Sequence, residues 1–277
     1  MTPLVRTTLL TFLAVLAAYE GFLRLAAPQV DQGADMGLTN AIRLENYADG
    51  GAPDTVLVGS SLAGRLQARM LPANWSNIAL TGGSALTGLQ LVAQSAITPR
   101  RVIIESNYLD RPSDAATLDA LTDWPQPLLR HLFWFTRTAY MPLNLVFSEV
   151  EEAIQRRRAE KGTNVESAPA NQADLTAALR PAYQSPPDFS RLPELAALVG
   201  RLQARGIEIG FVELPVEESL ANTPHLVLMR QQLRAMFGSV CWLRLGGGPW
   251  HTGDGEHLLT QDAARAAREL AAAPCER

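Results

Sequence analysis

The sequence has few of the residues on which nucleic-acid-binding and zinc-binding proteins depend, lysine and cysteine. Lys161 is the only lysine, and the net charge of -4 is the opposite of the basic footprint that nucleic-acid binding leaves. The only two cysteines, Cys241 and Cys275, are not arranged as C-x-x-C, which argues against a structural zinc site. We therefore expect no nucleic-acid partner, no metal and no cofactor.

The two cysteines leave two possibilities open. If the domain lies outside the cytoplasm, Cys241 and Cys275 could pair as a disulfide. The simpler interpretation, which we favour, is one buried thiol in a strand and one free thiol near the C-terminus. The sequence cannot decide between them, because pairing depends on how close the two Cα atoms lie.

Long hydrophobic runs are also scarce, and the one candidate for a membrane segment is short. After Arg6, residues 7–19 are almost all apolar, and the run continues past Glu20. A bilayer crossing needs about 20 residues, so the helix must extend through Glu20 and Arg24. The basic start favours a cytoplasmic N-terminus. We predict a signal-anchor over residues 1–28 and a single-pass inner-membrane protein whose domain faces the periplasm; a cleaved signal and a soluble amphipathic helix remain alternatives.

What the sequence does contain is a regular alternation of strand and helix patterns. Apolar runs at 55–58, 77–80, 101–105, 207–213 and 240–245 are typical of strands buried on both faces. Helical spacing covers 62–71, 84–97, 191–205 and 224–237, and a last helix is expected from 256 to 273. This order predicts an open α/β sheet with helices on both faces. We assign residues 29–277 to one domain.

Residues 110–184 interrupt this pattern. The segment has no convincing strand, and it carries an aromatic patch at 131–135, a helical pattern at 143–161 and a polar stretch at 162–171 that is typical of a flexible surface loop. Two interpretations stay open: a helical flap that completes the core, and a lid or a surface that rests on a membrane or a partner.

Polar and glycine residues follow the first three predicted strands. Ser61 ends the run Val58-Gly59-Ser60-Ser61, Gly82 follows the second strand, and Asn107 follows the third. Ligands of open α/β sheets bind beyond the carboxyl ends of the strands, so these residues are expected at one site. Alternatively, the serine is a helix N-cap and the other two belong to ordinary turns.

A general base and an orienting carboxylate are supplied near the C-terminus. Asp254 and His257 lie three residues apart, and imidazole titrates near neutrality. Asp254 would hold His257 in the tautomer that accepts a proton from Ser61. His251 is a rival base, and helix capping by Asp254 is the simpler alternative.

The order of these residues resembles the SGNH (GDSL-like) hydrolase superfamily. The resemblance covers about residues 53–273, outside the insertion. It implies a three-layer α/β/α flavodoxin-like fold of about five parallel strands. By position, Ser61 resembles the nucleophile, Gly82 and Asn107 the oxyanion donors beside the Ser61 backbone N–H, and Asp254 and His257 the rest of the triad. The usual Gly-Asp-Ser is Gly-Ser-Ser here, and the usual Gly-x-Asn-Asp is Glu-Ser-Asn-Tyr at 105–108.

The resemblance implies a serine esterase or O-acyltransferase that uses an acyl-enzyme and no cofactor. Combined with a membrane anchor, the resemblance suggests that the substrate is an acyl ester of a cell-envelope polysaccharide, or another acylated glycan or small ester. It also suggests a membrane-bound acyltransferase as a partner. Two alternatives are a catalytically silent polysaccharide-binding or scaffold protein of an export complex, and a secreted lipase that uses the aromatic patch. We expect the triad to be recognisable by contact between Ser61 and His257, with Asp254 behind the imidazole.

Overall fold

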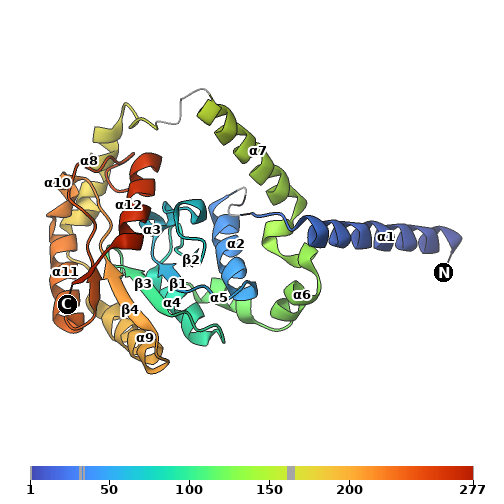
Figure 1. The fold of residues 1–277 in the computed structure, drawn as a ribbon, viewed down its shortest axis with the longest axis horizontal. Coiled ribbons are helices and arrows are strands. Elements are labelled where there is room, and N and C mark those ends of the chain that lie inside the picture. Colours follow the sequence, from blue (N-terminus) through green and yellow to red (C-terminus); the bar gives the residue numbers. More distant parts are fainter. Residues whose placement is uncertain (1, 31–32, 34, 161–165, 277) are drawn as a thin grey trace.

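The protein folds around one six-stranded sheet (Figure 1). The computed structural model describes residues 2–30, 33, 35–160 and 166–276. The strands lie in the order β2-β1-β3-β4-β5-β6. Neighbours from β2 to β5 are parallel, and β6 pairs antiparallel with β5. Their bounds are β1 Thr55–Val58, β2 Trp75–Asn77, β3 Arg101–Glu105, β4 Glu208–Val212, β5 Cys241–Leu243 and β6 Cys275–Glu276. The predicted α/β class is confirmed, with a mixed and mostly parallel sheet.

The central strands β1, β3 and β4 are buried on both faces, which explains why their middle positions are apolar or glycine. In β1, Val56 and Val58 belong to one hydrophobic cluster and Leu57 belongs to the other. The first cluster includes side chains from α4 (Ala85–Gln94), α9 (Leu192–Ala204) and α11 (Pro224–Phe237). The second includes α3 (Ser61–Gly64), α10 (Glu218–Ala221) and α12 (Thr260–Ala272). Each face is therefore covered by helices, and the strand ends are free to carry polar groups.

The helix expected at 84–97 ends early, at Gln94, and two other predicted helices differ more from the structure. The helix expected at 62–71 ends at Gly64, followed by the short η1 (Ala68–Met70). The Asn77 amide donates to the carbonyls of Ala63 and Leu66 and so holds the irregular turn that follows the helix. The helix expected from 256 begins only at Thr260. Asp254 and His257 therefore lie in a turn before the helix, whereas the prediction placed them at its start.

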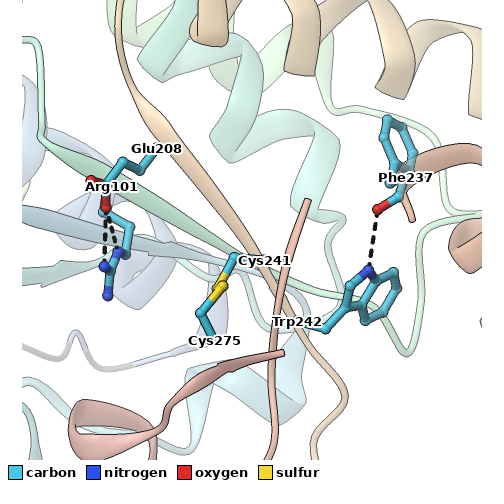
Figure 2. Close-up of a disulfide and its surroundings, with 6 residues drawn as sticks. All are labelled: Arg101, Glu208, Phe237, Cys241, Trp242 and Cys275. Atoms are coloured by element: carbon cyan, nitrogen blue, oxygen red, sulfur yellow. Dashed lines mark hydrogen bonds and ion pairs between the residues drawn. A yellow bond between two sulfur atoms is a disulfide. The ribbon is translucent and has the colours of Figure 1, made fainter. Parts of the chain in front are cut away.

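The C-terminus adds a strand that the sequence pattern did not predict. Cys241 in β5 and Cys275 in β6 form a disulfide with a Cα–Cα distance of 5.1 Å (Figure 2). The favoured prediction of two free thiols is therefore wrong. The physical reason is the antiparallel pairing of β5 and β6, which brings the two residues together although 34 positions separate them.

The insertion is helical, as its lack of strand patterns predicted. Among its described residues no strand occurs. It contains α5 (Ala115–Thr122), α6 (Gln126–Leu132), η2 (Trp134–Thr136), η3 (Thr138–Tyr140), α7 (Pro142–Glu160) and α8 (Gln172–Gln184). The helix predicted at 143–161 corresponds to α7. Lys161 and residues 162–165 of the predicted loop lie outside the described residues. The short η4 (Phe189–Arg191) leads from the insertion into α9.

The N-terminal helix α1 (Pro3–Ala26) extends away from the rest of the protein (Figure 1). Its most apolar window has a mean hydropathy of 1.6, and only 6% of that window is buried. By length and composition it is able to cross a membrane. The helix α2 (Met36–Asp49) follows it and packs Leu44 and Tyr47 into the first hydrophobic cluster.

Candidate active site

Ser61 is the first residue of α3, directly beyond the end of β1. The preceding Ser60 is the N-cap, and its hydroxyl accepts a hydrogen bond from Leu62 N at 3.2 Å. The capping interpretation thus holds for Ser60 and leaves the Ser61 hydroxyl free for another partner. Among the described residues, none accepts a hydrogen bond from the Ser61 backbone N–H. Helix N-termini present such unpaired donors to anionic groups.

His257 joins Ser61 to Asp254. Its Nε2 lies 2.8 Å from Ser61 Oγ, and its Nδ1 lies 2.6 Å from Asp254 Oδ2. The other oxygen of Asp254 accepts from the backbone N of Glu256 at 3.1 Å and of His257 at 2.8 Å. Asp254 is therefore fixed by the backbone of its own turn, and it can orient the imidazole so that Nε2 faces the serine.

The charges around His257 favour its protonated form. Burial alone would lower the pKa of His257, but the hydrogen bond and charge of Asp254, with the charge of Glu256, raise it above its ordinary value. Burial also opposes ionisation of Asp254, yet hydrogen bonds from His257 hold the pKa of Asp254 at about 2. This turn therefore stabilises an imidazolium, the ion that forms when histidine takes a proton from serine.

Glu256 is a second carboxylate beside His257 that the sequence interpretation did not include. Its Oε1 lies 3.6 Å from His257 Nδ1. Its other oxygen accepts hydrogen bonds from the hydroxyls of Tyr108 and, at 3.0 Å, Tyr183. These phenols remain protonated donors, because burial and the nearby Glu256 charge raise the pKa of each. Glu256 is thus held in place as a fixed negative charge.

The same turn contains a possible set of metal donors. One donor atom from each of Asp254, Glu256 and His257 lies within 4.8 Å of the others. Glu256, which the sequence interpretation did not include, completes this set of three donors. A cation bound at Nδ1 would compete with the hydrogen bond between Asp254 and His257, which already occupies that nitrogen.

Gly82 has the backbone conformation of a loop that exposes its peptide. Its φ of +73° lies in the left-handed region that favours glycine, and no described residue accepts a hydrogen bond from its N–H. The neighbouring Thr81 is clamped by Asn40 of α2, which donates to Thr81 O and accepts from Thr81 N, each at 2.9 Å. Asn40 therefore fixes the loop that carries Gly82, in which Thr81 lines the cavity beside Ser61 and Gly82 does not.

Asn107 has a structural role in this geometry. Its amide nitrogen donates to Leu214 O at 3.0 Å, and its amide oxygen accepts from Leu214 N at 2.8 Å. The side chain is fully buried and does not line the cavity beside Ser61. The structure thus brings Ser61, Asp254 and His257 together, but it gives no support to Asn107 as an oxyanion donor.

Glu105 holds the turn that presents Ser61. This residue is only 1% exposed, and its Oε2 accepts from Ser60 N at 2.7 Å, Ser60 Oγ at 2.8 Å and Ala63 N at 3.4 Å. Gly59 permits this approach, because a Cβ there would lie 2.6 Å from Glu105 Oε2. The two departures from the usual motifs, Ser60 and Glu105, are thus partners of each other. A charged residue at the end of an apolar strand was the only sequence signal for this role.

His251, the rival base, belongs to a different pair. Its Nδ1 lies 2.9 Å from Asp262 Oδ2, and its backbone N donates to the same oxygen at 2.9 Å. The ring is largely exposed, and it does not line the cavity next to Ser61. The structure thus separates His251 from the candidate nucleophile.

Ser61, Asp254 and His257 line a cavity of about 720 Å³. Its lining residues combine polar and charged side chains with apolar ones, and they include Arg43 of α2, Arg65 and four residues of the insertion, Glu166, Ser167, Pro169 and Leu175. Arg65 donates to Leu258 O at 3.0 Å and pairs with Glu166 at 3.4 Å. The volume suits a ligand of sugar or drug size. One part of the insertion therefore forms a wall of the site, whereas its aromatic patch does not.

Comparisons with known proteins do not extend this description. No family model matches the chain, and neither a characterised protein nor a solved structure matches it significantly.

Proposed function

We propose that this protein is a serine esterase or O-acyltransferase that works through an acyl-enzyme on Ser61. The observation that carries the proposal is the continuous hydrogen-bonded chain from Ser61 Oγ through both ring nitrogens of His257 to Asp254. Serine is a weak nucleophile unless an adjacent base takes its proton. A helix cap or a surface histidine would not require these three groups to meet on the wall of a cavity.

The geometry supports the following sequence of steps. Ser61 Oγ attacks the ester carbonyl while His257 Nε2 accepts the serine proton, and the carbonyl oxygen becomes an oxyanion. The backbone N–H groups of Ser61 and Gly82 are the candidate donors to it, and one such donor contributes about 3–4 kcal/mol. His257 then gives its proton to the departing alkoxide, which leaves an acyl-serine. Water or a sugar hydroxyl, deprotonated by His257, attacks that acyl group and releases Ser61.

We further propose that the chain is a divergent SGNH-like hydrolase with flavodoxin-like α/β/α layers. The strand order β2-β1-β3-β4-β5 is the order of flavodoxin-like sheets, whose ligands bind at the carboxyl ends of the strands. The proposed nucleophile lies directly beyond β1. Glu105 takes over the support of the nucleophile turn through its hydrogen bonds to Ser60.

The location we propose is the periplasmic side of the inner membrane. The N-terminal helix is able to cross a membrane, and the Cys241–Cys275 disulfide is typical of an oxidising compartment. The substrate class we propose is an acylated cell-envelope glycan, since Arg43, Arg65 and Gln67 line the cavity beside its apolar surface and offer hydrogen-bond donors to sugar hydroxyls. A lipase is less well supported, because Trp134 and Phe135 contact Glu20 of α1 and do not line the cavity.

A fluorophosphonate probe, which labels activated serines, tests the function. We expect labelling of the full chain, loss of labelling in Ser61→Ala, and retained labelling in Ser167→Ala, whose serine lines the same cavity. Labelling that survives Ser61→Ala would refute the assignment of the nucleophile. No labelling of the folded wild-type protein would favour the catalytically silent glycan-binding or scaffold protein instead.

A further inference from the structure

The last turns of α1 are fixed to the insertion by specific polar contacts. Glu20 accepts hydrogen bonds from the backbone N of Trp134 and of Phe135, each at 3.1 Å. Arg24 donates to Leu132 O at 2.7 Å, and the hydroxyl of Tyr19 donates to Tyr140 O at 2.5 Å. These contacts make the end of α1 part of the folded domain. They favour a retained anchor over a cleaved signal, because cleavage would remove Glu20 and Arg24 from their partners.

This attachment shortens the part of α1 that is left for the bilayer. Residues 3–18 precede the first of these contacts, and at 1.5 Å per residue they span about 24 Å. The hydrocarbon core is about 30 Å thick. A short span is accommodated by thinning of the bilayer or by flanking residues that enter the interface. The surface of the domain around the end of α1 is therefore expected to reach the lipid.

That surface is apolar. On the segments that hold α1, five large apolar side chains are each between 43% and 64% exposed. We call them the collar: Leu128, Leu132, Phe133, Met141 and Leu143. Figure 1 shows α6, which carries Leu128 and Leu132, and the start of α7, which carries Leu143, beside the C-terminal end of α1. Leu25 of α1 itself is 90% exposed, so the apolar surface continues from the anchor onto the domain.

Cationic and aromatic groups meet next to the end of α1. The guanidinium groups of Arg24 and Arg137 lie 5.5 and 5.0 Å from the centre of the Trp134 ring. Tryptophan is enriched at membrane–water interfaces, where its ring lies among the headgroups. Arginine side chains bury their stems in apolar surface and keep the charge in the polar region. These groups lie next to a helix that is able to cross a membrane, which favours lipid as the neighbour of this surface.

We propose that the collar lies in the boundary between headgroups and acyl chains of the leaflet that the domain faces. Lipid is its occupant, and it holds the domain in one orientation relative to the membrane. The proposal rests on insertion of α1, which belongs to the proposed location, and it is independent of the chemistry proposed for Ser61.

The experiment uses the full chain in nanodiscs of phosphatidylcholine and phosphatidylglycerol. Because the native cysteines are paired, single introduced cysteines can carry an environment-sensitive fluorophore. The collar positions are Leu132→Cys and Leu143→Cys, and Leu9→Cys reports on α1. The matched control is Leu228→Cys, an exposed apolar residue of α11, a helix that lies at the far end of the molecule from α1 in Figure 1.

We expect lipids with a nitroxide on the acyl chain to quench both collar probes and the α1 probe, but not the Leu228→Cys probe. Quenching of the collar probes by aqueous iodide should be at least about threefold weaker than that of the control, because interfacial side chains are shielded from water. Iodide quenching equal to the control, with the α1 probe still quenched by lipid, would overturn the proposal. Shielding from iodide without quenching by lipid would also overturn it, since a protein would then cover the collar.

Loss of lipid quenching at Leu9→Cys would overturn both the insertion of α1 and the collar proposal. Fluorophosphonate labelling measured on the same nanodiscs separates these results from the catalytic proposal. Labelling of Ser61 without lipid contact at the collar would refute only the membrane orientation. Lipid contact without labelling would refute only the chemistry.

Discussion

Replacing Glu105 by glutamine tests whether a buried carboxyl group supports the nucleophile turn. Burial raises the pKa of Glu105 above its usual value of 4.5, although hydrogen bonds from Ser60 and Ala63 act to lower it. The folded protein therefore binds this proton more tightly than the unfolded chain does. The stabilisation from Glu105 is fully present below pH 4.5 and is lost as the pH rises through the folded-state pKa.

The size of the change in the free energy of unfolding with pH follows from the binding of one proton at Glu105. Above pH 4.5 the free energy of unfolding of the wild type should fall, through this group, by up to about 1.4 kcal/mol per pH unit. Glu105→Gln has no such slope, because the amide does not titrate, and its oxygen still accepts from Ser60 N. Glu105→Ala instead leaves the buried N–H groups of Ser60 and Ala63 without this acceptor, at about 1–3 kcal/mol each, in addition to a cavity.

The assay is urea denaturation of the full chain in detergent micelles, followed by tryptophan fluorescence between pH 4.5 and 8.5. The informative quantity is the difference in the free energy of unfolding between Glu105→Gln and wild type at each pH, since the other titrating groups cancel. We expect that difference to shift in favour of the variant as pH rises and then to level off. A difference that does not change with pH, or that favours the wild type increasingly at high pH, would show that Glu105 is an ordinary ionised carboxylate and refute the reasoning.

Two further predictions concern the base and the disulfide. Glu256→Gln removes a negative charge 3.6 Å from His257 Nδ1, which should lower the pKa of His257. Because the neutral imidazole is the base, the acid limb of kcat/KM against pH for ester cleavage should then move to lower pH. An unmoved limb would contradict the role of Glu256. Cys275→Ser opens the 34-residue loop to Cys241, at a cost of about 4 kcal/mol by loop entropy. A reductant should lower the melting temperature of the wild type toward that of this variant, and an effect of reductant on the variant itself would point to another cause.

The strands that the sequence predicted best are those buried on both faces. β1 and β3 have the predicted bounds 55–58 and 101–105, because continuous burial leaves an uninterrupted apolar run. β2 was placed at 77–80 but covers Trp75–Asn77, although Ile78 N and Leu80 N still donate to Leu57 O and Gly59 O beside it. β6 is two residues long, and no periodicity is visible over such a length.

The triad residues were accessible to sequence reasoning, but their supports were not. Serine and histidine are residue types with known catalytic chemistry. Ser61 follows a predicted strand and His257 lies near the C-terminus, and these positions already place both residues at the carboxyl edge of the sheet. The contribution of Glu105 depends on how closely Gly59 lets two neighbouring strand ends approach, which is a property of the packed sheet. Asn107 is the opposite case. It lies at the position that the sequence predicted, but its amide forms hydrogen bonds with the backbone of Leu214.

The helix that follows the anchor connects the membrane to the candidate site. Asn40 of α2 clamps both peptide groups of Thr81. From the same helix, Arg43 donates to Ala79 O at 2.9 Å and to Gly64 O at 3.0 Å. One helix thus fixes the loop that carries Gly82 and the end of the short helix that begins at Ser61. The same helix is joined to the insertion that holds α1, because Glu45 accepts from Thr138 N at 2.7 Å and from Thr138 Oγ1 at 2.9 Å. An orientation imposed by lipid on the anchor and the collar would therefore be passed to the cavity through packed segments. This is a physical reason for a membrane anchor to belong to the domain rather than to a flexible tether.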